Sequence, residues 1–172
     1  MAKIIKNREI VEDTWTVLTL AANDTPETVR LPHGPVIVPL AVWRARKEDL
    51  IRREWDQGHA LGVWLGPKDN PADLAADIGD FSVVGVNFPL ASDGRGYSIA
   101  TLLRTRYGYA GELRAFGAVG RDHIHYLARV GFDAYAIEKP ELALAGLDDF
   151  SESYQAAANQ PLPLFRRRAA VA

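Results

Sequence analysis

Hydrophobic and polar positions alternate in two different ways along the chain, and the two patterns take turns from about residue 36 onward. Short continuous apolar runs predict strands, whereas apolar positions spaced i, i+3 and i+4 predict helices. The predicted strands cover residues 36–43, 61–65, 81–88, 112–118 and 133–137. The predicted helices cover residues 47–57, 71–78, 97–107, 121–130 and 141–158. Pro39 inside the first strand indicates an edge position or a bulge.

The two ends of the chain follow other patterns. Residues 3–20 predict a β-hairpin, in which Ile4 and Ile5 face two apolar residues across a turn near Asn7. The polar stretch that follows is rich in Pro, Asn, Asp and Thr, and it predicts a loop. Residues 159–172 hold two prolines and three adjacent arginines, and we expect a flexible basic tail there.

Strands that alternate with helices indicate right-handed βαβ crossovers and a mainly parallel sheet. We therefore predict one α/β domain over residues 1–158, built of about five βα units that follow the N-terminal β-hairpin. The spacing fits both a flavodoxin-like sheet and a partial (β/α)-barrel, and the sequence does not separate them. In either fold, ligands bind at the carboxyl ends of the strands, where Asn87, the loop 92–98, residues 118–122 and Glu138 lie.

Length and charge limit the classes of function. A chain of 172 residues suits one domain with a substantial core. The formal charge of −2 produces no overall attraction to nucleic acid or to an anionic membrane. No apolar run approaches the roughly 18 residues of a membrane helix, and the first residues become charged before a signal-peptide core forms. We therefore predict a cytoplasmic protein without nucleic-acid or membrane partners, and the sequence is compatible with a homo-oligomer.

Cysteine is absent from the sequence. The chain therefore forms no disulfide, carries no thiolate nucleophile and offers no cysteine ligand to zinc or to an iron–sulfur cluster. If the protein takes part in redox chemistry, the electrons must travel on a bound cofactor or belong to another protein. The sequence identifies no such cofactor.

Residues 93–137, which we call the signature segment, begin with a loop rich in glycine and arginine. Gly94 and Gly96 flank Arg95, so the loop can take positive φ and bring its backbone close to a partner, and Ser98 lies where a helix would start. Free amides at a helix N-terminus beside a guanidinium would bind an anion, with Asp93 orienting the arginine. The alternative is a turn in which the two side chains form a structural ion pair. The candidate anion- or ligand-binding residues are Asp93, Gly94, Arg95, Gly96, Tyr97, Ser98, Asn87, Arg121 and Asp122.

Other motifs are incomplete. The run GRGYSI departs from a dinucleotide fingerprint because Ile99 replaces its third glycine, and no phosphate-binding P-loop is present. His123 and His125 are spaced i, i+2, unlike helical zinc ligands, and His33 and His59 fall in loops that we expect to be unrelated. We predict no metal. No GxSxG elbow supports a serine hydrolase, and the sequence identifies no catalytic residue.

Five arginines accompany the signature segment, and we interpret most of them as solvated helix residues paired with nearby carboxylates. These arginines are Arg104, Arg106, Arg114, Arg121 and Arg129, and the expected partners are Glu112, Asp122 and Asp133. Arg114 differs because it alternates with apolar neighbours inside a predicted strand, so its side chain must reach a strand end or a carboxylate. Trp43, Trp55 and Trp64 each lie on an apolar face and are expected in the core.

The signature segment resembles a bacterial family of uncharacterised proteins, often labelled oxidoreductases and commonly encoded beside assimilatory sulfite reductase. The resemblance rests on DGRGYSIATLLRTRYGYAGELRAFGAV and RVGFDAY, with weaker similarity in IIKNREIVEDTW, VIVPLAVW and FSESYQ. It implies a role in sulfate or sulfite assimilation, without established catalytic residues. The family usually reads GDVLxDQ where this chain reads GAVGRDH, so Ala118 replaces an acid and His123 replaces an amide, while Asp122 is retained.

Three classes of function follow from these observations. The first is an accessory protein of assimilatory sulfite reduction, which binds the reductase or a small oxyanion through the Asp93–Ser98 loop. The alternative is an α/β enzyme that uses a flavin, a nicotinamide or a phosphorylated ligand at the strand ends, and it rests on the fold alone. A structural adaptor without a ligand is a third reading.

Overall fold

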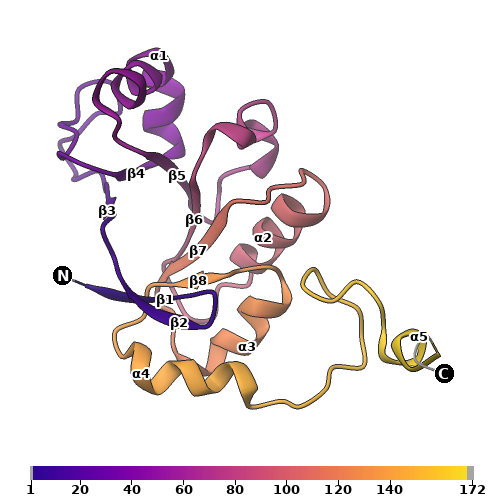
Figure 1. Cartoon of the computed structure of the whole chain (residues 1–172). Coiled ribbons are helices and arrows are strands. Elements are labelled where there is room, and N and C mark those ends of the chain that lie inside the picture. The colour runs from indigo at the N-terminus through magenta and orange to yellow at the C-terminus, as the bar shows by residue number, and fades with distance from the viewer. Residues whose placement is uncertain (1, 170–172) are drawn as a thin grey trace.

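The computed structural model describes residues 2–169, which form one eight-stranded sheet with helices against one of its faces (Figure 1). The strands, in chain order, are β1 (Lys3–Lys6), β2 (Glu9–Glu12), β3 (Thr16–Val17), β4 (Val36–Pro39), β5 (Leu61–Leu65), β6 (Val83–Phe88), β7 (Glu112–Gly117) and β8 (Ala134–Tyr135). The α-helices are α1 (Leu40–Gln57), α2 (Arg95–Thr105), α3 (Arg121–Arg129), α4 (Pro140–Ala143) and α5 (Leu164–Ala169). Short 3₁₀ helices cover Pro71–Leu74, Ile78–Asp80 and Leu144–Asp148.

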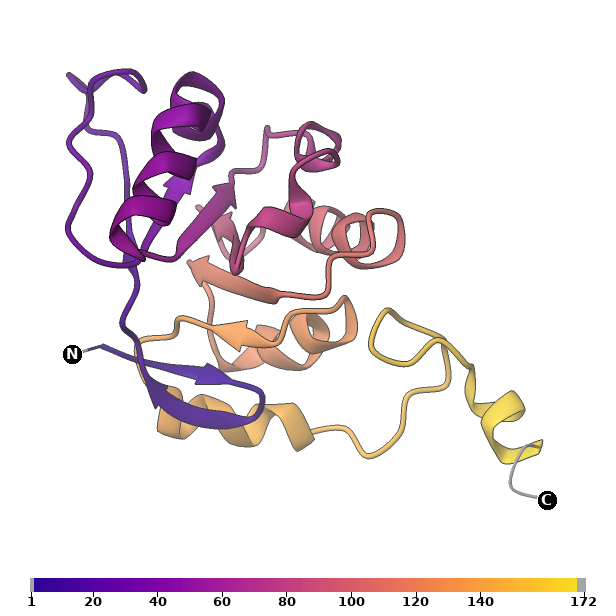
Figure 2. The same ribbon diagram turned by 45° about the horizontal axis from the view of Figure 1, so that its top comes forward.

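The strand order is β2-β1-β8-β7-β6-β5-β4-β3, and all neighbours from β8 to β3 are parallel. β1 is antiparallel to both β2 and β8, so the predicted hairpin joins the main sheet through one of its strands (Figure 2). The mixed α/β class, the mainly parallel sheet and the hairpin are confirmed. The sheet curls into a half-barrel, so of the two predicted folds the partial barrel describes it, and a flavodoxin-like sheet is not confirmed.

The curl follows from the connection between the two edge strands. β2 and β3 are the opposite edges of the sheet, yet only residues 13–15 separate them in the chain. Eight strands in a flat sheet span about 34 Å from edge to edge, at about 4.8 Å for each neighbour. The four chain steps from Glu12 to Thr16 reach at most about 14 Å. A flat sheet is therefore excluded, and the two edges must approach one another.

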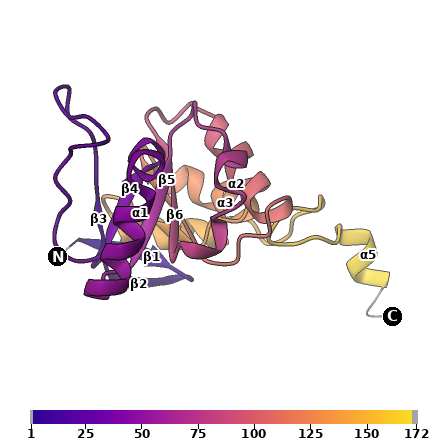
Figure 3. The same ribbon diagram turned by 90° about the horizontal axis from the view of Figure 1, so that it is seen from above.

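The curled sheet has an outer face and an inner face that differ in their side chains. On the outer face, residues such as Val63, Val84 and Leu113 form the main core with the helices. Helices α2 and α3 lie on the same side of the strands, whereas α5 lies apart from the sheet (Figure 3). The alternate residues of the same strands, including Trp64 and Arg114, point to the inner face. The helices thus supply most of the apolar packing and leave the inner face to polar and aromatic side chains.

Several predicted elements have different boundaries in the structure. The predicted strand 36–43 ends at Pro39, where α1 begins, because a continuous apolar run does not distinguish a buried strand from a buried helix. The helix reaches Gln57 with a kink at Arg46, and Gly58 ends it in the left-handed conformation (φ +64°).

The predicted helix 71–78 is replaced by two 3₁₀ turns, although Asn70 caps the first of them through a 3.1 Å hydrogen bond from the Ala72 amide. The predicted helix 141–158 stops at Asp148, because Gly146, the two aspartates and the serines that follow are weak helix formers. The predicted tail contains α5, and residues 170–172 lie outside the described part of the chain.

The three tryptophans behave differently from one another. Trp43 is buried, and Trp64 is half-buried with its indole N–H bonded to the Leu18 carbonyl at 2.8 Å. Trp55 is 88% exposed, so its placement in the core was wrong. None of the helices within residues 2–169 is long and apolar enough to cross a membrane.

Gly117 ends β7 with φ +97°, and a substitution there tests the close approach of the ends of β6 and β7 at the carboxyl end of the sheet. A Cβ at this position would lie 2.4 Å from the Phe88 carbonyl oxygen and 2.6 Å from Asn87 Oδ1. We expect Gly117→Ala to lower the free energy of unfolding by about 2 kcal/mol or more, which lowers the melting temperature by about 4–8 °C. The control is Gly79→Ala, where no heavy atom lies within 4 Å. Equal melting temperatures for the two variants would contradict the arrangement.

Candidate functional site

The predicted anion loop connects β6 to α2 at the carboxyl end of the sheet. The Asp93 carboxylate accepts three hydrogen bonds from Arg95: from the backbone N–H at 3.1 Å, from Nε at 2.9 Å and from Nη2 at 2.7 Å. These bonds hold the pKa of Asp93 below its usual value and raise the pKa of Arg95. The Asp93 carboxylate therefore accepts the first free N–H of the helix and binds the Arg95 guanidinium in a bidentate manner.

The two glycines of the loop have other roles than predicted. Neither Gly94, with φ −76°, nor Gly96 has a positive φ, so the loop does not use the conformational freedom that its glycines allow. The helix begins at Arg95, three residues before the predicted start at Ser98. A Cβ on Gly96 would lie 2.5 Å from the Phe88 ring. Glycine is needed there because the first turn of α2 packs directly against the end of β6.

The other candidate residues lie at separate places. Tyr97 turns away from Arg95, packs edge-on against Phe88 and lines a hollow of about 570 Å³ between α2 and α3, and partial burial raises its pKa. Asn87 is half-buried on the inner face beside Gly117. Arg121 pairs with Asp149 at 2.6 Å and not with Asp122. Among residues 2–169, no hydrogen bond or ion pair joins these groups to Arg95 or to each other, so the candidates do not form one cluster. Ser98 and Asp122 are exposed, and their side chains form no hydrogen bond or ion pair among the described residues.

Arg104 has a structural role in the signature segment. Its guanidinium donates hydrogen bonds to the carbonyls of Gly131 at 2.8 Å, Tyr109 at 2.6 Å and Gly111 at 2.8 Å. It also forms an ion pair with Asp133 at 2.7 Å. One side chain on α2 thereby binds the loops that enter β7 and β8, and it holds these three elements of the fold together.

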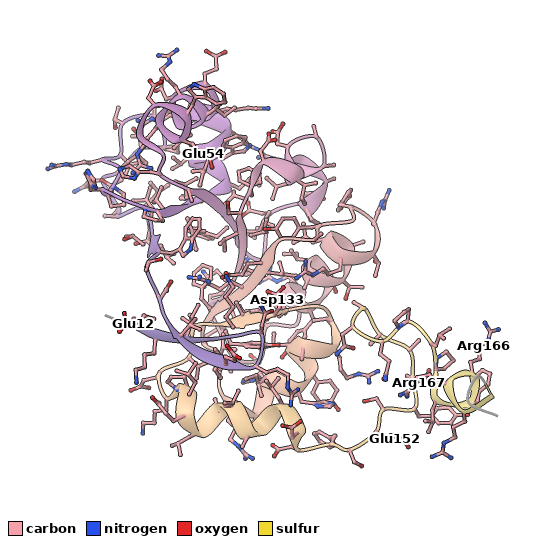
Figure 4. The ribbon with its side chains drawn as sticks, viewed as in Figure 1. Glu12, Glu54, Asp133, Glu152, Arg166 and Arg167 are labelled. Carbon is pink, nitrogen blue, oxygen red and sulfur yellow. The ribbon has the colours of Figure 1, made fainter. Side chains whose placement is uncertain are left out.

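Asp133 completes this arrangement from the other side, near the middle of the fold (Figure 4). Its second carboxylate oxygen accepts the Leu113 N–H at 2.8 Å, and its backbone carbonyl accepts the Asn7 N–H at 2.8 Å. Burial raises the pKa of Asp133, while the hydrogen bonds and Arg104 act in the opposite direction. The Tyr109 hydroxyl lies within hydrogen-bonding distance of the Phe81 carbonyl, at 3.1 Å. The polar residues of the signature segment are thus largely engaged in holding the fold.

Arg114 lies on the inner face and is 1% exposed. Its guanidinium binds Glu112 at 2.6 Å and both oxygens of Asp13 at 3.0 Å, which confirms that it reaches carboxylates. Lys6 binds the other oxygen of Glu112 at 2.8 Å. Two cations and two anions therefore form a neutral network in which Arg114 and Glu112 are buried, and we call it the inner-face quartet (Lys6, Asp13, Glu112 and Arg114). Sequence reasoning missed Lys6 and Asp13, because partners about 100 residues away give no local signal.

The histidines have mainly local contacts. His33 and His59 were expected in unrelated loops, but their ring centroids lie 4.6 Å apart. Partial burial, followed by His33 and Arg53, lowers the pKa of His59. His123 accepts the Gly120 N–H at 3.1 Å and caps α3. Within residues 2–169, no three His, Asp or Glu side chains are grouped so that they could hold a metal ion.

The structural role of Arg104 is testable against a control at Arg106, the exposed residue that caps the C-terminus of α2. We expect Arg104→Gln to lower the free energy of unfolding by about 3 kcal/mol or more, because it leaves three carbonyls and Asp133 without their donor. Arg106→Gln removes an exposed guanidinium and should change stability by less than about 0.5 kcal/mol. Urea unfolding of both variants measures the difference. A stable Arg104→Gln protein would show that the signature segment serves another purpose.

Comparisons with known proteins place this chain among relatives of unknown activity. No curated protein matches the sequence. The model of one protein family matches residues 62–165, which is more than half of the chain and includes the whole signature segment. The chain therefore belongs to a family of bacterial proteins of unknown function (DUF934).

Proposed function

We propose that the chain is an accessory protein of assimilatory sulfite reduction, and that it contacts the reductase through the Asp93–Ser98 loop. The connection with sulfite reduction rests on the family resemblance described above. The observation that supports a binding role is the Asp93–Arg95 pair, which presents a half-exposed guanidinium at the carboxyl end of the sheet. The buried charges of the signature segment and of the inner-face quartet bind each other or the backbone, which favours binding over catalysis.

The geometry of the pair favours a protein partner over a free oxyanion. Asp93 already occupies the Nε and Nη2 edge of Arg95 and the first helix amide, so a small oxyanion would have to displace it. The side chain of Arg95 nevertheless remains 56% exposed, and its Nη1 makes no hydrogen bond among the described residues. An arginine held in one conformation loses little entropy when a partner binds, and arginine is enriched at protein interfaces.

The loop also presents an apolar contact. Leu90 is 65% exposed, and residues 89–92 all lie at the surface just before the pair. An exposed leucine beside a fixed guanidinium provides an apolar anchor and a charged contact within one short segment. The alternative of an enzyme with a flavin, nicotinamide or phosphorylated ligand stays a prediction, because no specific contact in the structure favours it.

Arg95→Ala tests the proposal by affinity capture of the purified reductase on immobilised protein. We expect the dissociation constant to rise about tenfold or more, which corresponds to about 1.4 kcal/mol for a central arginine. The melting temperature should change little, because an exposed ion pair contributes about 0–1 kcal/mol. Arg106→Ala, at the exposed end of the same helix, is the matched control and should bind like the unchanged protein.

Two results would contradict the proposal in different ways. Failure of the unchanged protein to bind the reductase would remove the function itself. Equal binding by the unchanged protein and by Arg95→Ala would keep the partner but place the contact elsewhere on the surface.

A further inference from the structure

A second concentration of positive charge lies far from the Asp93–Ser98 loop in the sequence, around a hollow of about 300 Å³. We call it the arginine hollow. It is lined by α3, by the irregular segment that follows Leu147 and by α5. Its volume lies at the lower end of the range of about 300–1,000 Å³ for ligand sites. The residues that define its chemistry are Arg8, Arg129, Arg167, His125, Phe150 and Glu152.

The charges in this hollow are unbalanced. Three arginines line it against a single carboxylate, Glu152, and that carboxylate pairs with Arg168 at 3.0 Å. Arg8 is bound by Asp148 through both carboxylate oxygens. Arg129 and Arg167 instead use Nη2 to bind backbone carbonyls, those of Gln155 at 2.8 Å and Ser153 at 2.7 Å. These two guanidiniums are thus fixed in position, and no carboxylate within residues 2–169 pairs with either of them.

Arg167 provides the most specific sign of a missing partner. Its Nε is buried and has no hydrogen-bond partner among the described residues. A buried donor of this kind is unfavourable unless an acceptor reaches it. Arg167 points from α5 toward the segment that contains Ser153, whereas the neighbouring Arg166 points away from it (Figure 4). The adjacent arginine is therefore a natural control for the one that faces the hollow.

We propose that the arginine hollow binds a phosphate- or sulfate-type oxyanion between Arg129 and Arg167. A guanidinium offers parallel N–H donors that match two oxygens of such an anion, and both arginines have donors left over. The rings of His125 and Phe150, with centroids 4.6 Å apart and planes inclined by 49°, line the same hollow and form an aromatic wall beside the charges. An anionic group carried by a small organic molecule would place its body against this wall.

This proposal is independent of the one for the Asp93–Ser98 loop, and one calorimetric titration series separates the two. Calorimetry with inorganic phosphate, sulfate and adenosine monophosphate would be performed on the full chain and on single variants. We expect Arg129→Gln and Arg167→Gln to weaken phosphate binding about tenfold or more. Arg166→Gln, which keeps the helix and removes an outward charge, should bind within about twofold of the unchanged protein, and Arg95→Gln should bind normally.

Three results would overturn the proposal. The first is the absence of saturable binding of every probe. The second is unchanged phosphate binding in Arg167→Gln, a variant that alters only the peripheral helix α5 and so leaves the fold intact. The third is a loss of binding in Arg95→Gln alone, which would place the anion on the Asp93–Ser98 loop.

Adenosine monophosphate, a phosphate ester, distinguishes an anionic group carried by an organic molecule from a free oxyanion. If adenosine monophosphate binds at least about tenfold more tightly than phosphate, and Phe150→Ala removes that difference, the hollow recognises an anionic group on an organic molecule. If the two bind equally, the free oxyanion is the ligand.

Discussion

The contact between Arg114 and Asp13 connects two constraints on this fold. One is the short connection between the edge strands, and the other is the burial of an arginine on the inner face of the sheet. Asp13 belongs to the three-residue connection between the edge strands β2 and β3, and Arg114 belongs to β7 in the middle of the sheet. The connection forces the sheet to curl, and the curl brings the Asp13 carboxylate within 3.0 Å of a guanidinium 101 residues away. A buried arginine is strongly unfavourable without full pairing, and the curl adds the Asp13 carboxylate to the Glu112 partner that Arg114 already has on its own strand.

The pairing of buried charges also explains why the candidate residues of the signature segment do not form one cluster. Arg104 and Asp133 bind loops and strand ends together, and the inner-face quartet neutralises itself. The groups that remain available for partners lie at the surface, on the Asp93–Ser98 loop and in the arginine hollow. Position in the fold, and not the mere presence of charged residues, therefore separates structural arginines from those that can bind a ligand.

The parts of the fold that follow from local patterns could be predicted from the sequence. Leu61–Leu65 and β7 were predicted closely, because their apolar runs are short and bounded by turn residues. The start of α1 was missed since its first turn is as apolar as a buried strand. The exposure of Trp55 was missed because a helical face shows amphipathic spacing even where nothing packs against its last turn.

The candidate site was predictable only in part, for a related reason. The Asp93–Arg95 pair is local, and the sequence suggested it as one of two readings. The arginine hollow joins residues from both ends of the chain, such as Arg8 and Arg167, and only the tertiary fold reveals it.

A double-mutant cycle of Asp13→Asn and Arg114→Met, followed by urea unfolding, measures the contact between these two side chains. We expect losses of about 3 kcal/mol for each single variant and a double variant less destabilised than their sum by about 1 kcal/mol or more. Strict additivity, within about 0.5 kcal/mol, would contradict this expectation.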